Sequence, residues 1–136
     1  LNTSTVYDTE GSTIFIAPSK PPQIYLGLLC SKLVKFLSKN FIGHTVHCQV
    51  DELKELQVLV DVPDEIKKPV QSIVKNQKRT LDYDYASNEQ LEIDRLVYEA
   101  YGLNEDDIAE VENWYARRYP KLARAQNNRV TSKSEI

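Results

Sequence analysis

Apolar residues recur at helical spacing over two stretches in the first part of the chain. Between residues 23 and 40 this spacing predicts one amphipathic helix, whose apolar face is formed by Leu26, Leu29, Leu33, Phe36 and Leu37. A second helix is predicted over residues 64–79, with an apolar face formed by Ile66, Val70, Ile73 and Val74. Pro69 falls early in this second segment, where it either kinks the helix or marks its first turn.

Two further helices are predicted after a polar joint at residues 82–87. Ser87 and Gln90 have the spacing of a capping box, and the helix they begin is expected to run to Gly102, which suits a left-handed C-cap. Asn104 is expected to cap the next helix, which ends before Pro120. Because the link between them is short, these helices predict an αα-hairpin.

Three stretches with β-branched residues predict strands at residues 12–17, 44–50 and 58–62. The sequence therefore predicts an α+β fold: a small mixed sheet with packed helices, followed by a C-terminal helical hairpin. We expect three parts, namely residues 1–81, the hairpin over residues 82–124, and a flexible polar tail over residues 125–136.

The composition is that of a globular protein, with 41% hydrophobic and 27% charged residues. No apolar run approaches the ~18 residues of a membrane span, and the start carries no signal-peptide pattern. Cys30 and Cys48 lie in apolar runs, which favours reduced cysteines and a cytoplasmic location, a disulfide between them being a minor alternative. The chain has no methionine and a polar start, so we expect a fragment of a longer protein.

Candidate catalytic and metal-binding groups are weak in this sequence. His44 and His47 lie three apart, with Cys48 next to His47, but residues three apart on a strand point to opposite faces, and no second ligand cluster exists. The four glycines are too scattered to cradle a phosphate, and the many carboxylates after residue 82 are typical of solvated helix faces. We therefore expect no catalytic, cofactor-binding or metal-binding residue, and no enzyme activity in this chain itself.

Charge is distributed unevenly, with a net charge of −10 over residues 82–112 and +5 over residues 113–136. Lys32, Lys35 and Lys39 share one helix surface and are followed by amide, imidazole and hydroxyl groups that suit contacts to phosphates and base edges. Two other groups are equally consistent with binding or with a solvated face: Lys67, Lys68, Lys75, Lys78 and Arg79, then Arg117, Arg118, Lys121 and Arg124.

Two segments resemble a known family. The run I-Y-L-G-L-L-C-S-K-L, residues 24–33, resembles the Y-L-L-G-L-L-N-S-K-L helix of DNA target-recognition domains, with Cys30 in place of the usual Asn. Gly43-His44-Thr45 then corresponds to a Gly-Ser/Thr loop, and residues 53–63 are a loose version of a proline-containing segment. Residues 92–108 are similar to the I-D-x-L-V-Y-x-L-Y-G-L-T-E-E-E-I hairpin of TaqI-like and type IIG restriction–modification adenine-specific DNA methyltransferases.

The resemblance implies a non-catalytic DNA sequence-recognition fragment, with residues 1–81 forming the C-terminal part of a target-recognition domain. It implies double-stranded DNA and an upstream methyltransferase domain of the same chain as partners, and no membrane. S-adenosylmethionine would bind in that upstream domain, with Mg²⁺ where an endonuclease is fused. The residues expected to contact DNA are Lys32, Lys35, Lys39, Asn40, His44, Thr45 and His47.

A different class of function stays open at this point. A protein-interaction or scaffolding module would dock to another domain or subunit through the acidic helical hairpin, with Trp114 and Tyr115 as anchors. Binding to duplex DNA at two salt concentrations separates the two hypotheses, because phosphate contacts weaken as salt rises.

Overall fold

The computed structural model describes residues 19, 21–42 and 62–134, and every regular element in these ranges is a helix. The main helices are α1 (Pro22–Leu29), α2 (Lys32–Leu37), α4 (Lys67–Arg79), α5 (Glu89–Ala100), α6 (Glu105–Arg118) and α7 (Pro120–Ser134). A π-helical turn, η1 (Ser38–Ile42), follows α2, and a 3₁₀ turn, η2 (Asp64–Ile66), precedes α4.

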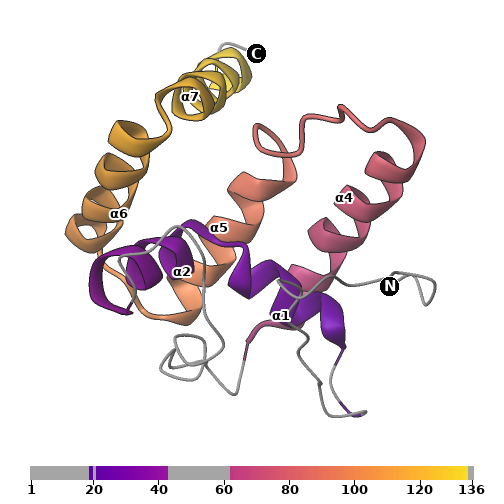
Figure 1. The fold of residues 1–136 in the computed structure, drawn as a ribbon, viewed down its shortest axis with the longest axis horizontal. Coiled ribbons are helices and arrows are strands. Elements are labelled where there is room, and N and C mark those ends of the chain that lie inside the picture. Colours follow the sequence, from indigo (N-terminus) through magenta and orange to yellow (C-terminus); the bar gives the residue numbers. More distant parts are fainter. Residues whose placement is uncertain (1–18, 20, 43–61, 135–136) are drawn as a thin grey trace, which may run out of the picture.

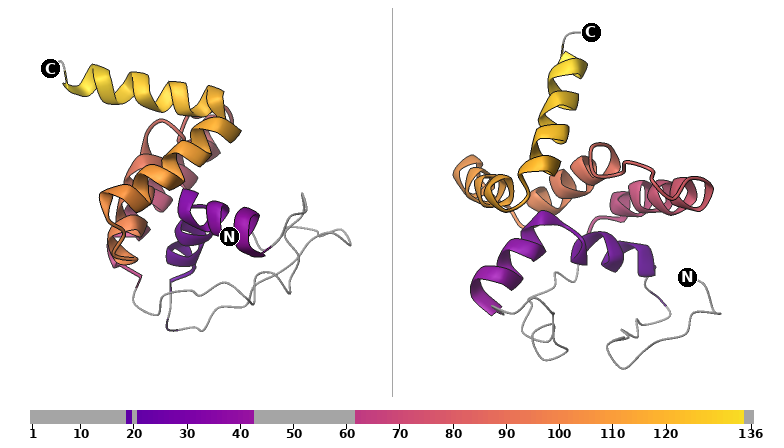
Figure 2. Two further views of the ribbon diagram at one scale, coloured as in Figure 1. Left: turned by 90° about the vertical axis from the view of Figure 1, so that its left-hand side faces the viewer. Right: turned by 45° about the horizontal axis from the view of Figure 1, so that its top comes forward.

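Helix α5 lies between α4 and α6, with α1 and α2 crossing beside it (Figure 1). It contacts α1, α2 and α4, while α6 packs mainly against α2 and α7. Two further views show α7 extending away from the other helices (Figure 2). One buried cluster joins five of these elements and η2: Leu28, Leu33, Val34, Ile66, Val70, Ile93, Leu96, Val97, Tyr98 and Val111.

The predicted α+β fold with a small mixed sheet is wrong for the part of the chain that the structure describes, since residues 21–42 and 62–134 contain helices and turns but no strand. Two of the predicted strands, 12–17 and 44–50, lie outside the described residues, as does nearly all of the third at 58–62. The physical reason is that the apolar side chains here recur at helical spacing, so each helix buries its face against other helices.

The long helix predicted over residues 23–40 is divided into α1 and α2. Cys30 ends α1, and Ser31 adopts an extended backbone with a φ of −68° and a ψ of 156°. The Ser31 hydroxyl accepts a hydrogen bond from the backbone N–H of Val34, which makes Ser31 the N-cap of α2. The apolar spacing continues across this break, and for that reason the periodicity alone predicted one helix.

Helix α4 settles the role of Pro69. The helix begins at Lys67, so Pro69 lies in its first turn, where a missing N–H leaves no intrahelical hydrogen bond unmade. Ile66 and Val70 are buried on the predicted apolar face, while Val74 on the same face is exposed.

The turn between α5 and α6 has the predicted geometry. Gly102 adopts a φ of 65°, and the N–H groups of Gly102 and Leu103 donate to the carbonyls of Glu99 and Tyr98. Asn104 and Asp107 then form a reciprocal capping box at the start of α6. The left-handed C-cap and the Asn104 N-cap are therefore confirmed.

Two local predictions in the C-terminal part are corrected. Helix α5 begins at Glu89 with Asn88 at its N-cap, so Ser87 and Gln90 form no capping box; the side chain of Gln90 instead donates to Cys30 and Asp94. Residues 125–134, which we expected to form a flexible tail, belong to α7. The buried side chain of Gln126 donates to the carbonyl of Ala86 and so ties α7 to the loop before α5.

Candidate functional site

A buried carboxylate joins α5 to the start of α2. Asp94, only 2% exposed, accepts a hydrogen bond of 2.8 Å from the backbone N–H of Lys32 and one of 3.2 Å from the amide of Gln90. Together with the Ser31 hydroxyl, Asp94 satisfies N–H groups in the first turn of α2, which have no partner within their own helix. Its acidic charge also lies at the positive end of the α2 dipole.

The Lys32 side chain forms a second connection, between α2 and α6. Its ammonium is 2.8 Å from a carboxylate oxygen of Glu112 and lies 4.5 Å from the centre of the Tyr115 ring. The Tyr98 hydroxyl donates to the same Glu112 carboxylate at 2.8 Å. Because Lys32 is only 3% exposed, its charge is paired with Glu112 within the protein and is not presented at the surface.

Burial raises the pKa of Asp94 to about 6, and the nearby Glu112 charge acts in the same direction, against the Lys32 N–H, the Lys32 charge and Gln90. The ordinary pKa of an aspartate is about 4. The folded protein therefore binds this proton more tightly than the unfolded chain does, and the resulting stability is present below about pH 4 and lost as the pH rises through about 6.

We expect Asp94 to lower the free energy of unfolding by about 2–3 kcal/mol between about pH 4 and about pH 7. The measurement is urea unfolding across this range for the wild type and for Asp94→Asn, which keeps an acceptor oxygen but cannot ionise. Other carboxylates, such as Glu89 with its lowered pKa, titrate in both proteins, so the difference between the two pH profiles isolates Asp94. Parallel profiles would show that Asp94 does not titrate in this range.

The structure separates the residues that were predicted to contact DNA. Lys32 is buried and paired, so it cannot reach a phosphate, and we remove it from the set. Lys35 and Asn40 are exposed on α2 and η1, and Lys39 beside them is half-buried. His44, Thr45 and His47 lie outside the described residues.

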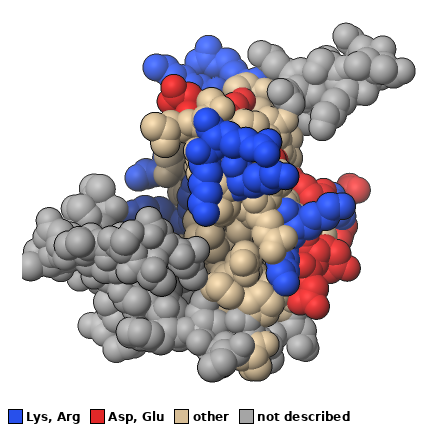
Figure 3. All heavy atoms as spheres, turned by 90° about the vertical axis from the view of Figure 1, so that its right-hand side faces the viewer, with Lys and Arg blue, Asp and Glu red and all other residues tan. Residues whose placement is uncertain are grey.

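Helix α4 presents a basic face that the sequence indicated only as one of three equivalent groups. Its five cations are all exposed, and the helix contains no acidic residue: Lys67, Lys68, Lys75, Lys78 and Arg79. At 3.6 residues per turn these five positions fall within an arc of about 120° on one side of the helix. Seen from the α4 side of the molecule, basic side chains gather across the middle of the surface (Figure 3).

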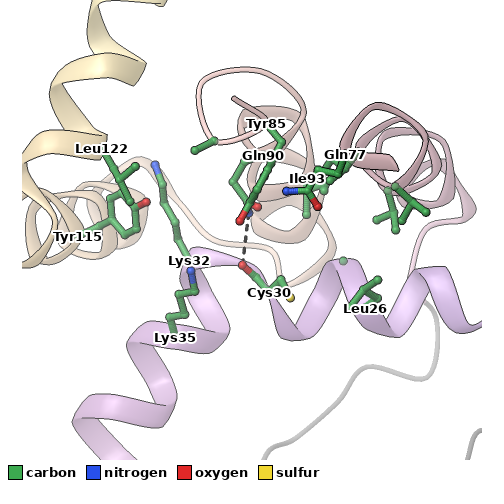
Figure 4. Close-up of a pocket in the computed structure, with 15 residues that line it drawn as sticks. Leu26, Cys30, Lys32, Lys35, Gln77, Tyr85, Gln90, Ile93, Tyr115 and Leu122 are labelled. Carbon is green, nitrogen blue, oxygen red and sulfur yellow. Dashed lines mark hydrogen bonds between the residues drawn. The ribbon is translucent and has the colours of Figure 1, made fainter. Parts of the chain in front are cut away.

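A pocket of about 270 Å³ opens between α1, α4, the loop before α5, and the junction of α6 with α7. Val70, Ile73, Ile93 and Tyr115 are among its apolar lining residues. Figure 4 shows Leu26, Gln77, Tyr85 and Leu122 around this space, with Lys35 beside it and Gln90 donating to the Cys30 carbonyl.

The sequence did not reveal this pocket, although it contained a signal. Leu26 and Val74 were assigned to the apolar faces of their helices, yet both lie at the edges of those faces and stay exposed. An apolar stripe wider than the neighbouring helices can cover leaves such residues at its margin.

The described residues hold no group of three or more side chains that would suit a metal ion. Cys30 is a free cysteine, and burial of its sulfur raises the pKa of the thiol despite the nearby Lys35 charge, which disfavours a nucleophilic thiolate. None of the described helices has the length and apolar character needed to cross a membrane.

Comparison of the chain with protein-family models, with curated proteins and with solved structures gave no match.

Proposed function

We propose that this chain is a DNA-recognition module of a restriction–modification-type, adenine-specific DNA methyltransferase, contributing binding and not chemistry. In this proposal an upstream domain of the same cytoplasmic protein binds S-adenosylmethionine and methylates the adenine. The present chain holds duplex DNA in register for that domain. Mg²⁺ enters only where the parent protein also carries an endonuclease.

The observation that carries the DNA-binding proposal is the acid-free basic face of α4. Five exposed cations lie on one side of α4, which contains no acidic residue of its own, and the exposed acids Asp64 and Glu65 lie before its first residue in η2. Phosphate groups are the natural partners of such a surface, because each contact releases a condensed counterion from DNA. Three of the five acids of α6 lie in its first turn, at Glu105, Asp106 and Asp107.

The contact between the two segments that resemble the family supports the same proposal. The S-K-L segment supplies the Lys32 N–H, and the I-D-R-L-V-Y segment supplies the Asp94 carboxylate that accepts it. This contact gives a reason for both motifs to occur in one chain, because the Asp94 carboxylate of one segment accepts the Lys32 N–H of the other. A recognition domain needs a rigid scaffold of this kind beneath the residues that contact DNA.

The anchors of the protein-docking alternative are used inside the fold. Tyr115 is 4% exposed and lies beneath the Lys32 ammonium. Trp114 is half-buried and packs edge-on against Phe36, with ring centres 5.6 Å apart. These aromatic residues hold α6 against α2, and docking through their buried faces would require α6 to separate from α2.

The test is fluorescence anisotropy of a labelled DNA duplex with the full chain at several salt concentrations. A variant in which Gln replaces Lys75, Lys78 and Arg79 should bind about 10- to 100-fold more weakly at low salt. The slope of its log affinity against log salt concentration should decrease by the equivalent of up to about three phosphate contacts. These exposed residues have no ion pair within the described residues, so the variant should stay folded.

The matched control replaces Arg117, Arg118 and Lys121 with Gln, which changes the net charge equally on the α6–α7 side. A smaller loss than in the α4 variant is expected. Equal losses would show that the effect comes from net charge and not from α4. A wild-type chain without salt-dependent DNA binding would remove the proposed function altogether.

A further inference from the structure

Exposed apolar side chains converge on the pocket beside α4. The large hydrophobic residues exposed in the described part of the chain are Leu26, Phe41, Val74, Leu81, Tyr85 and Leu122. Four of them, Leu26, Val74, Tyr85 and Leu122, line this one pocket. They come from α1, α4, the loop before α5, and α7, so the tertiary structure alone brings them together (Figure 4). An apolar patch of this kind, rimmed by polar residues, is typical of an interaction site.

The charged residues around the pocket indicate the charge of the partner that it binds. Its lining contains Lys32 and Lys35 but no Asp or Glu. Lys32 is neutralised by Glu112, whereas Lys35 is exposed and has no ion pair within the described residues. The uncompensated charge at the rim is positive, and it complements a partner that carries acidic groups beside its apolar ones.

The shape of the site favours a helix as the bound element. The walls are helices and the loop before α5, so the described residues offer no sheet edge to which an extended peptide could add. An amphipathic helix places apolar anchors at spacings of i, i+3, i+4 and i+7, and such a stripe fits an apolar groove. The charged backbone of a nucleic acid gains no binding energy from the apolar side chains of Leu26, Val74 and Leu122. The pocket and the basic face of α4 therefore suit different kinds of partner.

We propose that the pocket lined by Leu26, Val74, Tyr85 and Leu122 binds an acidic amphipathic helix of a partner protein. Apolar side chains of the partner enter the pocket, and its carboxylates pair with Lys35 at the rim. This site stands whether or not the chain binds DNA, because its apolar residues and Lys35 lie outside the basic residues of α4 on which DNA binding is proposed.

The probe is a synthetic helical peptide of Ala, Leu and Glu, with Leu at i, i+3, i+4 and i+7 and Glu at the remaining exposed positions. Its charge-reversed counterpart carries Lys in place of each Glu. Titrated into the isotope-labelled full chain, the acidic peptide should shift the NMR signals of Leu26, Tyr85 and Leu122, and the basic peptide should not. Binding of both peptides, or of neither, would overturn the proposal.

Variants then locate the binding surface. Leu26→Glu and Leu122→Glu should each weaken binding of the acidic peptide about tenfold or more, and Lys35→Glu should do so through charge repulsion. The controls are Phe41→Glu and Leu81→Glu, which change apolar residues that are more exposed and lie outside the pocket, and they should leave binding unchanged. Equal losses in pocket and control variants would contradict the proposal.

Two other occupants of the pocket, a second copy of the chain and DNA, are tested by sedimentation and by competition. Sedimentation of the free chain over a range of concentrations reports self-association; if dimers form and Leu122→Glu dissolves them, the occupant is a second copy and the proposal is wrong. An unlabelled DNA duplex added as competitor should leave the peptide-induced shifts of Leu26 and Leu122 in place. Displacement of the peptide by DNA would assign the pocket to nucleic acid instead.

Discussion

Replacing Asp94 with Ala is expected to lower the free energy of unfolding at neutral pH by about 2–4 kcal/mol. Asp94 is buried in α5 and accepts hydrogen bonds from the Lys32 N–H and the Gln90 amide. Alanine leaves both donors without this acceptor in a buried position, where water cannot replace it. The loss comes from these hydrogen bonds and not from the charge, because burial raises the pKa of Asp94 and so disfavours its ionised form.

The measurement is urea unfolding at pH 7, followed by far-UV circular dichroism. Glu99→Ala is the matched control, because it removes an exposed carboxylate from the same helix and is expected to cost about 0.5 kcal/mol or less. Asp94→Asn keeps one acceptor oxygen and should recover part of the loss. If Asp94→Ala unfolds at the same urea concentration as Glu99→Ala, the connection between α5 and α2 does not stabilise the fold.

Replacing Gly27 with Val is expected to destabilise the protein by about 3 kcal/mol through steric overlap between α1 and the start of α4. A Cβ atom at Gly27 would lie 2.4 Å from Cγ2 of Ile66 and 2.9 Å from Cγ2 of Val70. Both neighbours are buried and branched at Cβ, so neither side chain can move aside easily. The helices would have to separate, and the core between them would lose contact.

Gly27→Ala should cost less, since alanine gains about 1 kcal/mol of helix propensity over glycine and this offsets part of the overlap. The control is Leu26→Val, which places valine at the neighbouring, exposed position of α1 and should change stability by a few tenths of a kcal/mol. Thermal and urea unfolding measure all three variants. A Gly27→Val protein as stable as Leu26→Val would contradict the close approach of α1 to α4.

Local signals in the sequence predicted the C-terminal elements well. Gly102 and Asn104 act on their own neighbours, so their roles follow from backbone geometry within a few residues. Pro69 was also readable, because proline is accommodated in a first helical turn and costs much more in a helix interior. The capping box predicted at Ser87 failed because Gln90 has a more distant partner, the Cys30 carbonyl, that local spacing cannot show.

The candidate sites were predicted less completely, since exposure depends on what packs against each residue. Lys32, Lys35 and Lys39 have the same side chain and lie on the same predicted surface. The fold buries Lys32 against Glu112 and leaves Lys35 exposed. Glu112 is 80 residues away in sequence, and nothing near Lys32 indicates the pairing. For α4 the sequence supplied the charges, and the structure supplied their common exposure.

By itself, the sequence determined the segments that form α4, α5 and α6, the caps at Gly102 and Asn104, the acid-free character of α4, and the absence of a recognisable catalytic motif. Only the tertiary structure decided that α1 and α2 are separate helices, because the Asp94 carboxylate that meets the Lys32 N–H comes from α5. It also decided that Leu26, Val74, Tyr85 and Leu122 surround one pocket. Capping hydrogen bonds and apolar spacing along one helix depend on neighbouring residues and can be predicted from the sequence. Which side chains are buried, and which meet at one pocket, depends on how helices distant in the sequence pack.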